Sequence, residues 1–171
     1  TIETGTVHNP HYYQFQRQQA PDIVGSSLGF HSSRNNIAAA INNNEAQLLS
    51  TSVHESVHVM NSGMFGHLPR WINEGLAEYL ERMKVFGQAA EIPVASGLLR
   101  LVSQKRLSLN YVVHASQKDW QGDNQDNLYA HSWALVYFLL GQTQGKKLVH
   151  EYLVASAKSP CHEEPIDAYI Q

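Results

Sequence analysis

The five residues His54-Glu55-Ser56-Val57-His58 are the most informative stretch of this sequence, because they predict a helix that carries a metal-binding pair of histidines. On an α-helix, residues four positions apart lie above one another, so both imidazoles point into the same space. Two neutral imidazoles with this spacing can chelate one tetrahedral Zn²⁺ ion, and Glu55 can reach a metal-activated water without binding the metal. The alternative interpretation is an ordinary helix whose histidines are partly exposed.

A second helical stretch follows and reads WINEGLAEYLE over residues 71–81. Its apolar residues recur at helical spacing, which predicts an amphipathic helix, and Gly-His-Leu-Pro at residues 66–69 predicts the break before it. A zinc site for hydrolysis needs three protein ligands and one open position for water. Glu74, in the first turn of this helix, is the natural third ligand, and Gly75 beside it allows another backbone to approach closely.

The two motifs together resemble those of the gluzincin metallopeptidases, in which HExxH is followed on a second helix by a ligand glutamate in an NExxx(D/E) context. The resemblance is closest to the bacterial peptidase-MA-like families of the DUF1570 type, whose second motif is similar to WINEGLAEYLE. It implies that His54, His58 and Glu74 bind zinc and that Glu55 is the general base.

The resemblance also gives a role to Glu78, four residues beyond the ligand glutamate, where the family has an acceptor for a hydrogen bond from a ligand histidine. Such a carboxylate fixes the histidine tautomer and raises the basicity of the ligand. The alternative for Glu78 is a solvated position, because carboxylates on helices are mostly surface groups. Glu81 lies on nearly the same face but further away, and we expect it to be solvated surface.

A donor to the oxyanion of the reaction is a further part that the resemblance implies, supplied by a Tyr or His on a downstream helix. Residues 129–133, Tyr-Ala-His-Ser-Trp, begin such a helix. Residues two apart on a helix do not share a face, so we expect only one of Tyr129 and His131 to point at the metal. Tyr129 is favoured because the resembling families commonly carry Tyr at this position. The alternative is that both residues only pack against the start of the helix.

The composition is that of a compact globular protein. Of the 171 residues, 43% are hydrophobic and 16% charged, which excludes a disordered chain. The net charge is −3 and the basic residues are scattered, so no nucleic-acid footprint is present. The single Cys161 excludes an intramolecular disulfide framework, and the longest apolar run, Trp133–Leu140, is far shorter than the roughly 20 residues that span a bilayer. We expect one zincin-like metallopeptidase domain over residues 1–171, excised from a longer chain.

We expect an α+β fold, in which a small antiparallel sheet with an edge strand precedes a mostly helical zincin-like catalytic domain. Two short apolar stretches around a polar turn predict a hairpin. Its segment Asn35–Ile41 is the candidate edge strand for pairing with an extended peptide; the alternative is a hairpin without substrate contact. The glutamine-rich residues 14–19 fit a strand or a helix. Helical patterns cover approximately residues 45–62, 70–86, 94–105, 110–117, 128–140 and 146–157, with a polar loop at 119–127.

Together these observations predict a zinc-dependent peptidase that hydrolyses polypeptides with Glu55 as general base. The Gly-x-Met-Glu-Asn signature with which the aminopeptidase subgroup holds a free amino terminus is absent upstream of His54, which favours an endopeptidase. The alternative is a catalytically inactive zincin-fold module that binds peptide or cell-wall material, which would need the metal ligands but not Glu55. The resembling families imply an extracytoplasmic bacterial protein, periplasmic or secreted.

Overall fold

The computed structural model describes residues 9–21, 28–42 and 44–169. Most of them are helical, and the strands form two small antiparallel hairpins, so the predicted α+β class is confirmed. The helices are α1 Pro10–Gln19, α2 Glu45–Phe65, α3 Arg70–Leu80, α4 Ser96–Gln104, α5 Leu109–His114, α6 Gln117–Trp120, α7 Gln125–Leu140, α8 Thr143–Lys158 and a 3₁₀ turn at Ile166–Ala168. The strands are β1 Gly29–Ser32, β2 Ile37–Ala40, β3 Lys84–Phe86 and β4 Ala89–Glu91.

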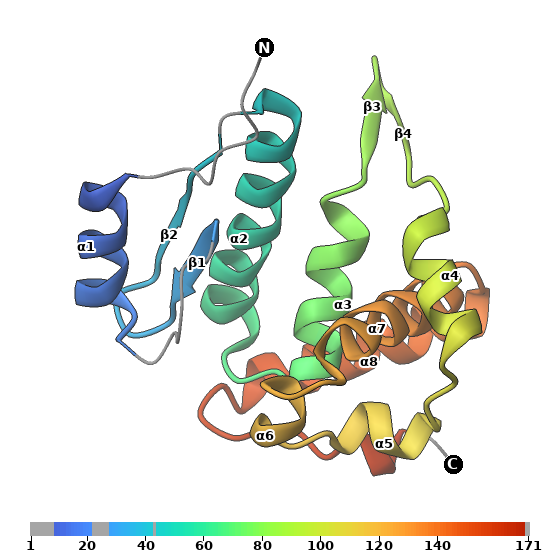
Figure 1. Cartoon of the computed structure of the whole chain (residues 1–171). Helices are drawn as coiled ribbons and strands as arrows, with labels where there is room; N and C mark the ends of the chain where they lie inside the picture. The colour runs from blue at the N-terminus through green and yellow to red at the C-terminus, as the bar shows by residue number, and fades with distance from the viewer. Residues whose placement is uncertain (1–8, 22–27, 43, 170–171) are drawn as a thin grey trace.

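The elements form two groups (Figure 1). One contains α1, the β1–β2 hairpin and α2, and the other contains α3, α4, α7 and α8. Helices α2 and α3 run antiparallel across the boundary, and α3 packs along α7. The core lies mainly under α3 and α7 and is formed by Val57, Trp71, Ile72, Leu76, Ala77, Val112, Trp120, Leu128, Val136, Val149, Tyr152 and Ile166.

The hairpin predicted before the HExxH helix is present. Strands β1 and β2 pair antiparallel, with Gly29 opposite Ala40 and Ser32 opposite Ile37. The glutamine-rich residues 14–19, which fitted a strand or a helix, belong to α1. That helix begins at Pro10, where the missing N–H and fixed φ cost nothing.

The helix that carries the second motif is shorter than predicted. It ends at Leu80 instead of Phe86, because residues 84–91 form the β3–β4 hairpin. Gly87, at a φ of +61°, opens the two-residue turn between the strands, a backbone conformation that suits glycine. The predicted polar loop 119–127 is also shorter, since α6 extends to Trp120 and α7 begins at Gln125.

Gly75 makes the close backbone approach that its position predicted. A Cβ at this residue would lie 2.6 Å from the Ser132 carbonyl oxygen and 2.7 Å from Val136 Cγ2, both on α7. Real Cβ atoms essentially never come within 3.0 Å of other atoms. The absence of a side chain at Gly75 therefore sets how closely α3 can approach α7.

Replacing this glycine should consequently loosen the helix pair that carries Glu74. We expect Gly75→Ala to lower the free energy of unfolding by about 1–3 kcal/mol, the usual cost of overpacking a well-packed core. Gly97→Ala is the matched control, because a Cβ at Gly97 meets nothing within 4 Å and the residue is exposed on α4. Urea unfolding followed by circular dichroism measures both variants, and equal midpoints would contradict this packing role.

Among the described residues, no helix has both the length and the apolar character that crossing a membrane requires.

Candidate metal centre

The candidate metal centre lies where α2 faces α3. His54 and His58 come from α2, and Glu74 comes from α3. Glu74 Oε2 lies 3.5 Å from His54 Nε2 and 3.3 Å from His58 Nε2. A tetrahedral Zn²⁺ ion with ligands at about 2.0–2.1 Å separates them by about 3.3–3.4 Å. The spacing of these atoms therefore fits a single zinc ion.

Two buried atoms of this group have no hydrogen-bond partner among the residues that the structure describes. They are Glu74 Oε2 and His58 Nδ1. A buried polar atom that is left unsatisfied costs about 1–3 kcal/mol, and a cation held between the two imidazoles would satisfy Glu74 Oε2. Imidazole nitrogen and carboxylate oxygen are both ligands that zinc accepts. The residues present thus fit a zinc ion in chemistry as well as in spacing.

The histidines and glutamates of the centre shift one another's pKa values. Burial alone would lower the pKa of His54, but contacts with Glu74 and Glu81 outweigh it and raise that pKa to about 10. Burial alone would raise the pKa of Glu74, but the adjoining His54 and His58 outweigh it and hold that pKa well below its usual range. A metal ion at this site would therefore compete with protons for the imidazole nitrogens.

Glu55 lies beside the histidines but outside the group of three candidate ligands. Burial raises the pKa of its carboxyl group, and the charges of His58 and His54 partly offset the rise. The backbone of β1 lies directly against this side chain: a Cβ at Gly29 would come within 2.7 Å of Glu55 Oε1 and 2.9 Å of Glu55 Cγ. A side chain at position 29 would therefore have to displace Glu55 and also Thr51, whose Cγ2 would lie even closer to the added Cβ.

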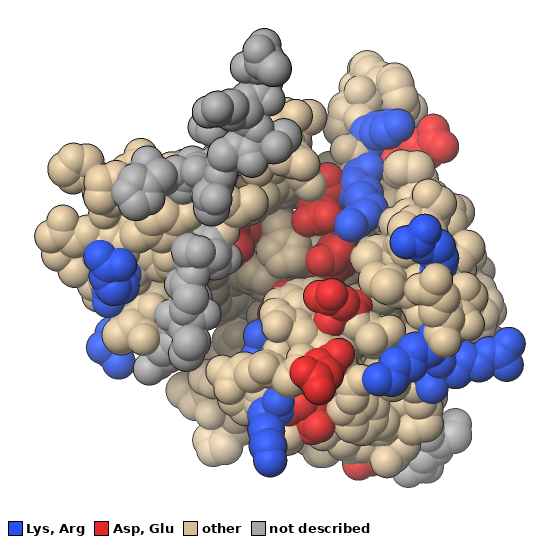
Figure 2. Space-filling model, viewed as in Figure 1, with Lys and Arg blue, Asp and Glu red and all other residues tan. Residues whose placement is uncertain are grey.

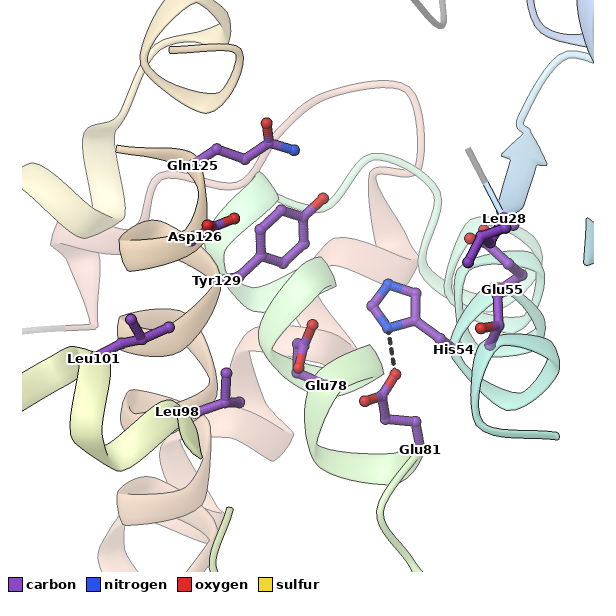
Figure 3. Close-up of a pocket in the computed structure, with 12 residues that line it drawn as sticks. Leu28, His54, Glu55, Glu78, Glu81, Leu98, Leu101, Gln125, Asp126 and Tyr129 are labelled. Atoms are coloured by element: carbon purple, nitrogen blue, oxygen red, sulfur yellow. Dashed lines mark hydrogen bonds and ion pairs between the residues drawn. The ribbon is translucent and has the colours of Figure 1, made fainter. Parts of the chain in front are cut away.

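The hydrogen bond expected between a ligand histidine and Glu78 is instead made by Glu81. His54 Nδ1 donates to Glu81 Oε2 at 2.9 Å (Figure 3). This leaves Nε2 of the same ring to face Glu74. The expectation that Glu81 is solvated surface is therefore wrong, since only 13% of its side chain is exposed. Glu78 is also largely buried, so it is not a solvated surface group either, but it accepts a hydrogen bond from Arg82 at 2.8 Å.

The antiparallel arrangement of α2 and α3 explains why Glu81, and not Glu78, accepts the hydrogen bond from His54. His58 lies nearer the turn that joins α2 to α3 and meets Glu74 in the first turn of α3. His54 lies one turn earlier on α2, so it faces a later part of α3. Seven residues make about two helical turns, which puts Glu81 on the same face as Glu74 and within reach of His54.

The two glutamates should therefore differ in their effect on the metal. We expect Glu81→Ala to weaken zinc binding by roughly 10- to 100-fold, because it removes the acceptor that holds the tautomer of a ligand histidine. Glu78→Ala is the matched control and should have the smaller effect: Arg82 contacts both carboxylates, but it is Glu81 that accepts the hydrogen bond from His54. Competition with a chromogenic chelator measures both affinities. A larger loss in Glu78→Ala than in Glu81→Ala would contradict the assignment.

Tyr129 and His131 have different surroundings in the structure. Tyr129 lines the cavity beside His54 and Glu55, and its ring points into that cavity (Figure 3). His131 makes two other hydrogen bonds: Nδ1 donates to the Asn127 carbonyl at 2.7 Å, and Nε2 accepts the Leu107 N–H at 3.1 Å. Both nitrogens of the His131 imidazole are therefore occupied, and of the two residues it is Tyr129 that lines the cavities beside the candidate centre.

Three adjoining cavities, of about 430, 390 and 640 Å³, meet at the centre. We refer to the three together as the groove. The first two share Glu55 and Tyr129, and the last two share His58, Arg70 and Glu74. The candidate metal centre thus lies in the middle of the groove, which extends past it in both directions.

The strand that lines this groove is β1. Gly29, Phe30 and His31 of β1 line its cavities, whereas none of the three cavities is lined by β2, Ile37–Ala40. The cavities thus border β1, and pairing of an extended peptide with segment Asn35–Ile41 stays a prediction. Spacing along the sequence could not distinguish the two strands of a hairpin, because the choice depends on which of them packs towards α3.

The charge in the groove is unevenly distributed. Acidic side chains follow one wall of the central hollow (Figure 2). At one end of the groove these include Glu78, Glu81 and Asp126, together with apolar Leu98 and Leu101. The opposite end is lined by Arg34, His67 and Arg70, among others.

Two residues at the centre were not singled out from the sequence. Arg70 lies one helical turn before Glu74 and lines two of the cavities, and Gln125 of α7 lines two as well. The one available signal was the four-residue spacing between Arg70 and Glu74, which puts them on one helix face. The position of Gln125 depends on how α7 crosses α3, for which the sequence contains no direct signal.

The described fold and site define a mostly helical α+β protein with a candidate His-His-Glu metal centre in a groove. The chain belongs to the DUF1570 family of proteins of unknown function, whose family model matches residues 48–162. The matched region includes both motifs and Tyr129. Neither a curated protein nor a solved structure matches the chain.

Proposed function

We propose that the protein is a zinc-dependent endopeptidase of the gluzincin type. The observation that carries this proposal is the convergence of His54 Nε2, His58 Nε2 and Glu74 Oε2 at the spacing of a tetrahedral zinc site. Glu55 lies beside these three ligands, inside the groove. Binding a metal or a peptide does not need a buried carboxylate at that position, whereas hydrolysis needs a base.

Zinc at these ligands would act as a Lewis acid that acidifies water and polarises the scissile carbonyl group. Glu55 then takes a proton from the attacking water and delivers it to the nitrogen of the leaving amine. The raised pKa of Glu55 favours this exchange, because a base is most effective when its pKa approaches the working pH.

Tyr129 supplies the hydrogen bond that stabilises the developing oxyanion. Burial raises the pKa of its hydroxyl, the charge of Glu74 adds to the rise, and Arg70 partly offsets it. The hydroxyl therefore keeps its proton at neutral pH and can donate it in a hydrogen bond as charge forms on the carbonyl oxygen.

The substrate class follows from the shape of the groove. An extended polypeptide can enter on one side of the centre and leave on the other, which supports internal cleavage over removal of terminal residues. Strand β1 lies along the groove, so a peptide can align with it in the manner of an added strand.

The test is digestion of denatured protein and of a mixed peptide library by the zinc-loaded chain, with the products identified by mass spectrometry. We expect internal cleavages that a chelator abolishes and added zinc restores. A zinc-loaded protein that retains peptides but cuts none across the library would contradict the proposal and favour a binding module.

A further inference from the structure

Arg70 lies in the proposed active site, in the cavity that Glu74 and Tyr129 also line. It is the first residue of α3, and one third of its side chain is exposed. Its Nε lies 3.4 Å from Glu74 Oε1, the oxygen that does not face the histidines. The two oxygens of this carboxylate therefore have different neighbours: Oε2 faces the proposed metal position and Oε1 faces the guanidinium.

The guanidinium of Arg70 is also held from the side of α6. Its NH1 donates to Gln117 Oε1 at 3.1 Å, and its central carbon lies 5.0 Å from the centre of the Trp120 ring. Trp120 is almost fully buried, so the ring is a fixed support. A cation over the face of an indole ring is attracted by the negative charge of that face. This arrangement orders the side chain before any substrate arrives.

The same indole ring also contacts Tyr129. The rings of Trp120 and Tyr129 meet edge to face, with centroids 5.2 Å apart and planes at 87°. Arg70 and Tyr129 line the same cavity, and the Trp120 ring contacts both of them. Arg70 thus contacts Glu74 directly and the proposed oxyanion donor through the Trp120 ring.

We propose that Arg70 is a positioning residue that aligns Glu74 and Tyr129 with a single guanidinium. By binding Oε1, it leaves Oε2 of Glu74 facing the two histidines. By holding the Trp120 ring against which the Tyr129 ring packs, it keeps the Tyr129 hydroxyl in place beside the centre. This inference rests on the proposed peptidase function, but its effect on Glu74 can be measured without any peptidase activity.

Lysine should not replace Arg70 in this role. A guanidinium presents several N–H groups in a rigid planar fork and stacks on an indole, whereas an ammonium group is a compact point charge on a flexible stem. Arg70→Lys keeps the positive charge and most of the packing, so it should fold even if Arg70→Ala does not. Comparing this variant with wild type therefore shows whether the planar shape of the guanidinium matters in addition to its positive charge.

The first measurement is zinc affinity, determined by chelator competition. We expect Arg70→Ala and Arg70→Lys both to bind zinc roughly 10- to 100-fold more weakly than wild type, as when a neighbour that supports a metal ligand is removed. Arg100→Ala, which removes an exposed arginine from α4, is the matched control and should bind as wild type does. Unchanged affinity in both Arg70 variants would overturn the proposed role at Glu74.

The second measurement is a double-mutant cycle on kcat between Arg70→Lys and Tyr129→Phe, with every variant saturated with zinc. If Arg70 acts by keeping the Tyr129 hydroxyl in place, Arg70→Lys lowers kcat less in the Tyr129→Phe background, which has no hydroxyl to misplace, than in wild type. KM should change less than kcat. Additive losses in the cycle would overturn the coupling.

The outcomes also distinguish this inference from the function on which it rests. Wild-type protein that binds zinc but cleaves nothing would contradict the peptidase proposal and the coupling through Tyr129, while the affinity measurement would still decide the role at Glu74. Wild-type protein that takes up no zinc would overturn both proposals.

Discussion

Glu55→Gln should lower the rate of peptide hydrolysis by at least about 10²- to 10⁴-fold, the usual contribution of a general base. Glutamine keeps the size of the side chain and much of its hydrogen bonding, but it cannot take a proton from water at neutral pH. Zinc content should stay near that of wild type, because Glu55 is not among the three candidate ligands. The assay follows internal cleavage of a peptide library and measures zinc in the same samples.

Loss of cleavage with zinc retained is the combination of results that supports Glu55 as the base. Equal cleavage by both forms would mean that another residue acts as base or that the activity comes from a contaminant, and the chelator control tells these apart. Glu91→Gln makes the same chemical change at an exposed position on β4, outside the three cavities, and should leave the rate unchanged.

Glu74→Gln should remove most of the zinc affinity and with it the stabilisation that zinc provides. At a free zinc concentration one hundred times the dissociation constant, a ligand of the folded state adds about 2.7 kcal/mol to its stability. For a chain of this size, that corresponds to a rise in Tm of roughly 5–10 °C. We expect the rise in wild type and its absence in Glu74→Gln at the same zinc concentration.

Differential scanning fluorimetry with and without zinc measures this effect, and elemental analysis gives the stoichiometry. Glu91→Gln should keep the full response. Full zinc retention in both Glu74→Gln and His58→Ala would show that the zinc binds elsewhere in the chain. The surface residue His11 is one place to look, because histidines outside the centre can bind metal adventitiously.

The parts of the site that the sequence predicted are those that depend on helical geometry alone. His54 and His58 share a face because they are four residues apart, and Glu74 meets them because a short turn joins two amphipathic helices. The expectation that Tyr129 and His131 do not both face the centre followed from the same geometry, since residues two apart diverge, whereas the preference for Tyr129 came from the family resemblance. In each case the relevant distance is set within one helix or across one tight turn.

The parts that were missed depend on packing between elements. Glu81 replaces Glu78 because the antiparallel crossing of α2 and α3 brings His54 to a later turn of α3. β1 lines the groove instead of β2 because of the way the hairpin docks on α2. Helix α3 ends at Leu80 because a hairpin with Gly87 in its turn follows it. In the sequence, that glycine indicates a turn, but the apolar residues before it fit a continuing helix.

The contact between Gly29 and Glu55 has an evolutionary consequence. A methyl group at position 29 would overlap the carboxylate, so the strand that borders the groove and the proposed base cannot vary independently. Relatives that keep the glutamate should keep glycine at this place in the strand. Relatives that have lost the glutamate become free to accept larger residues there only if position 51 also changes, because a Cβ at position 29 would come even closer to Thr51 Cγ2 than to Glu55. Coordinated substitution at positions 29, 51 and 55 would therefore mark the members of the family that have given up catalysis.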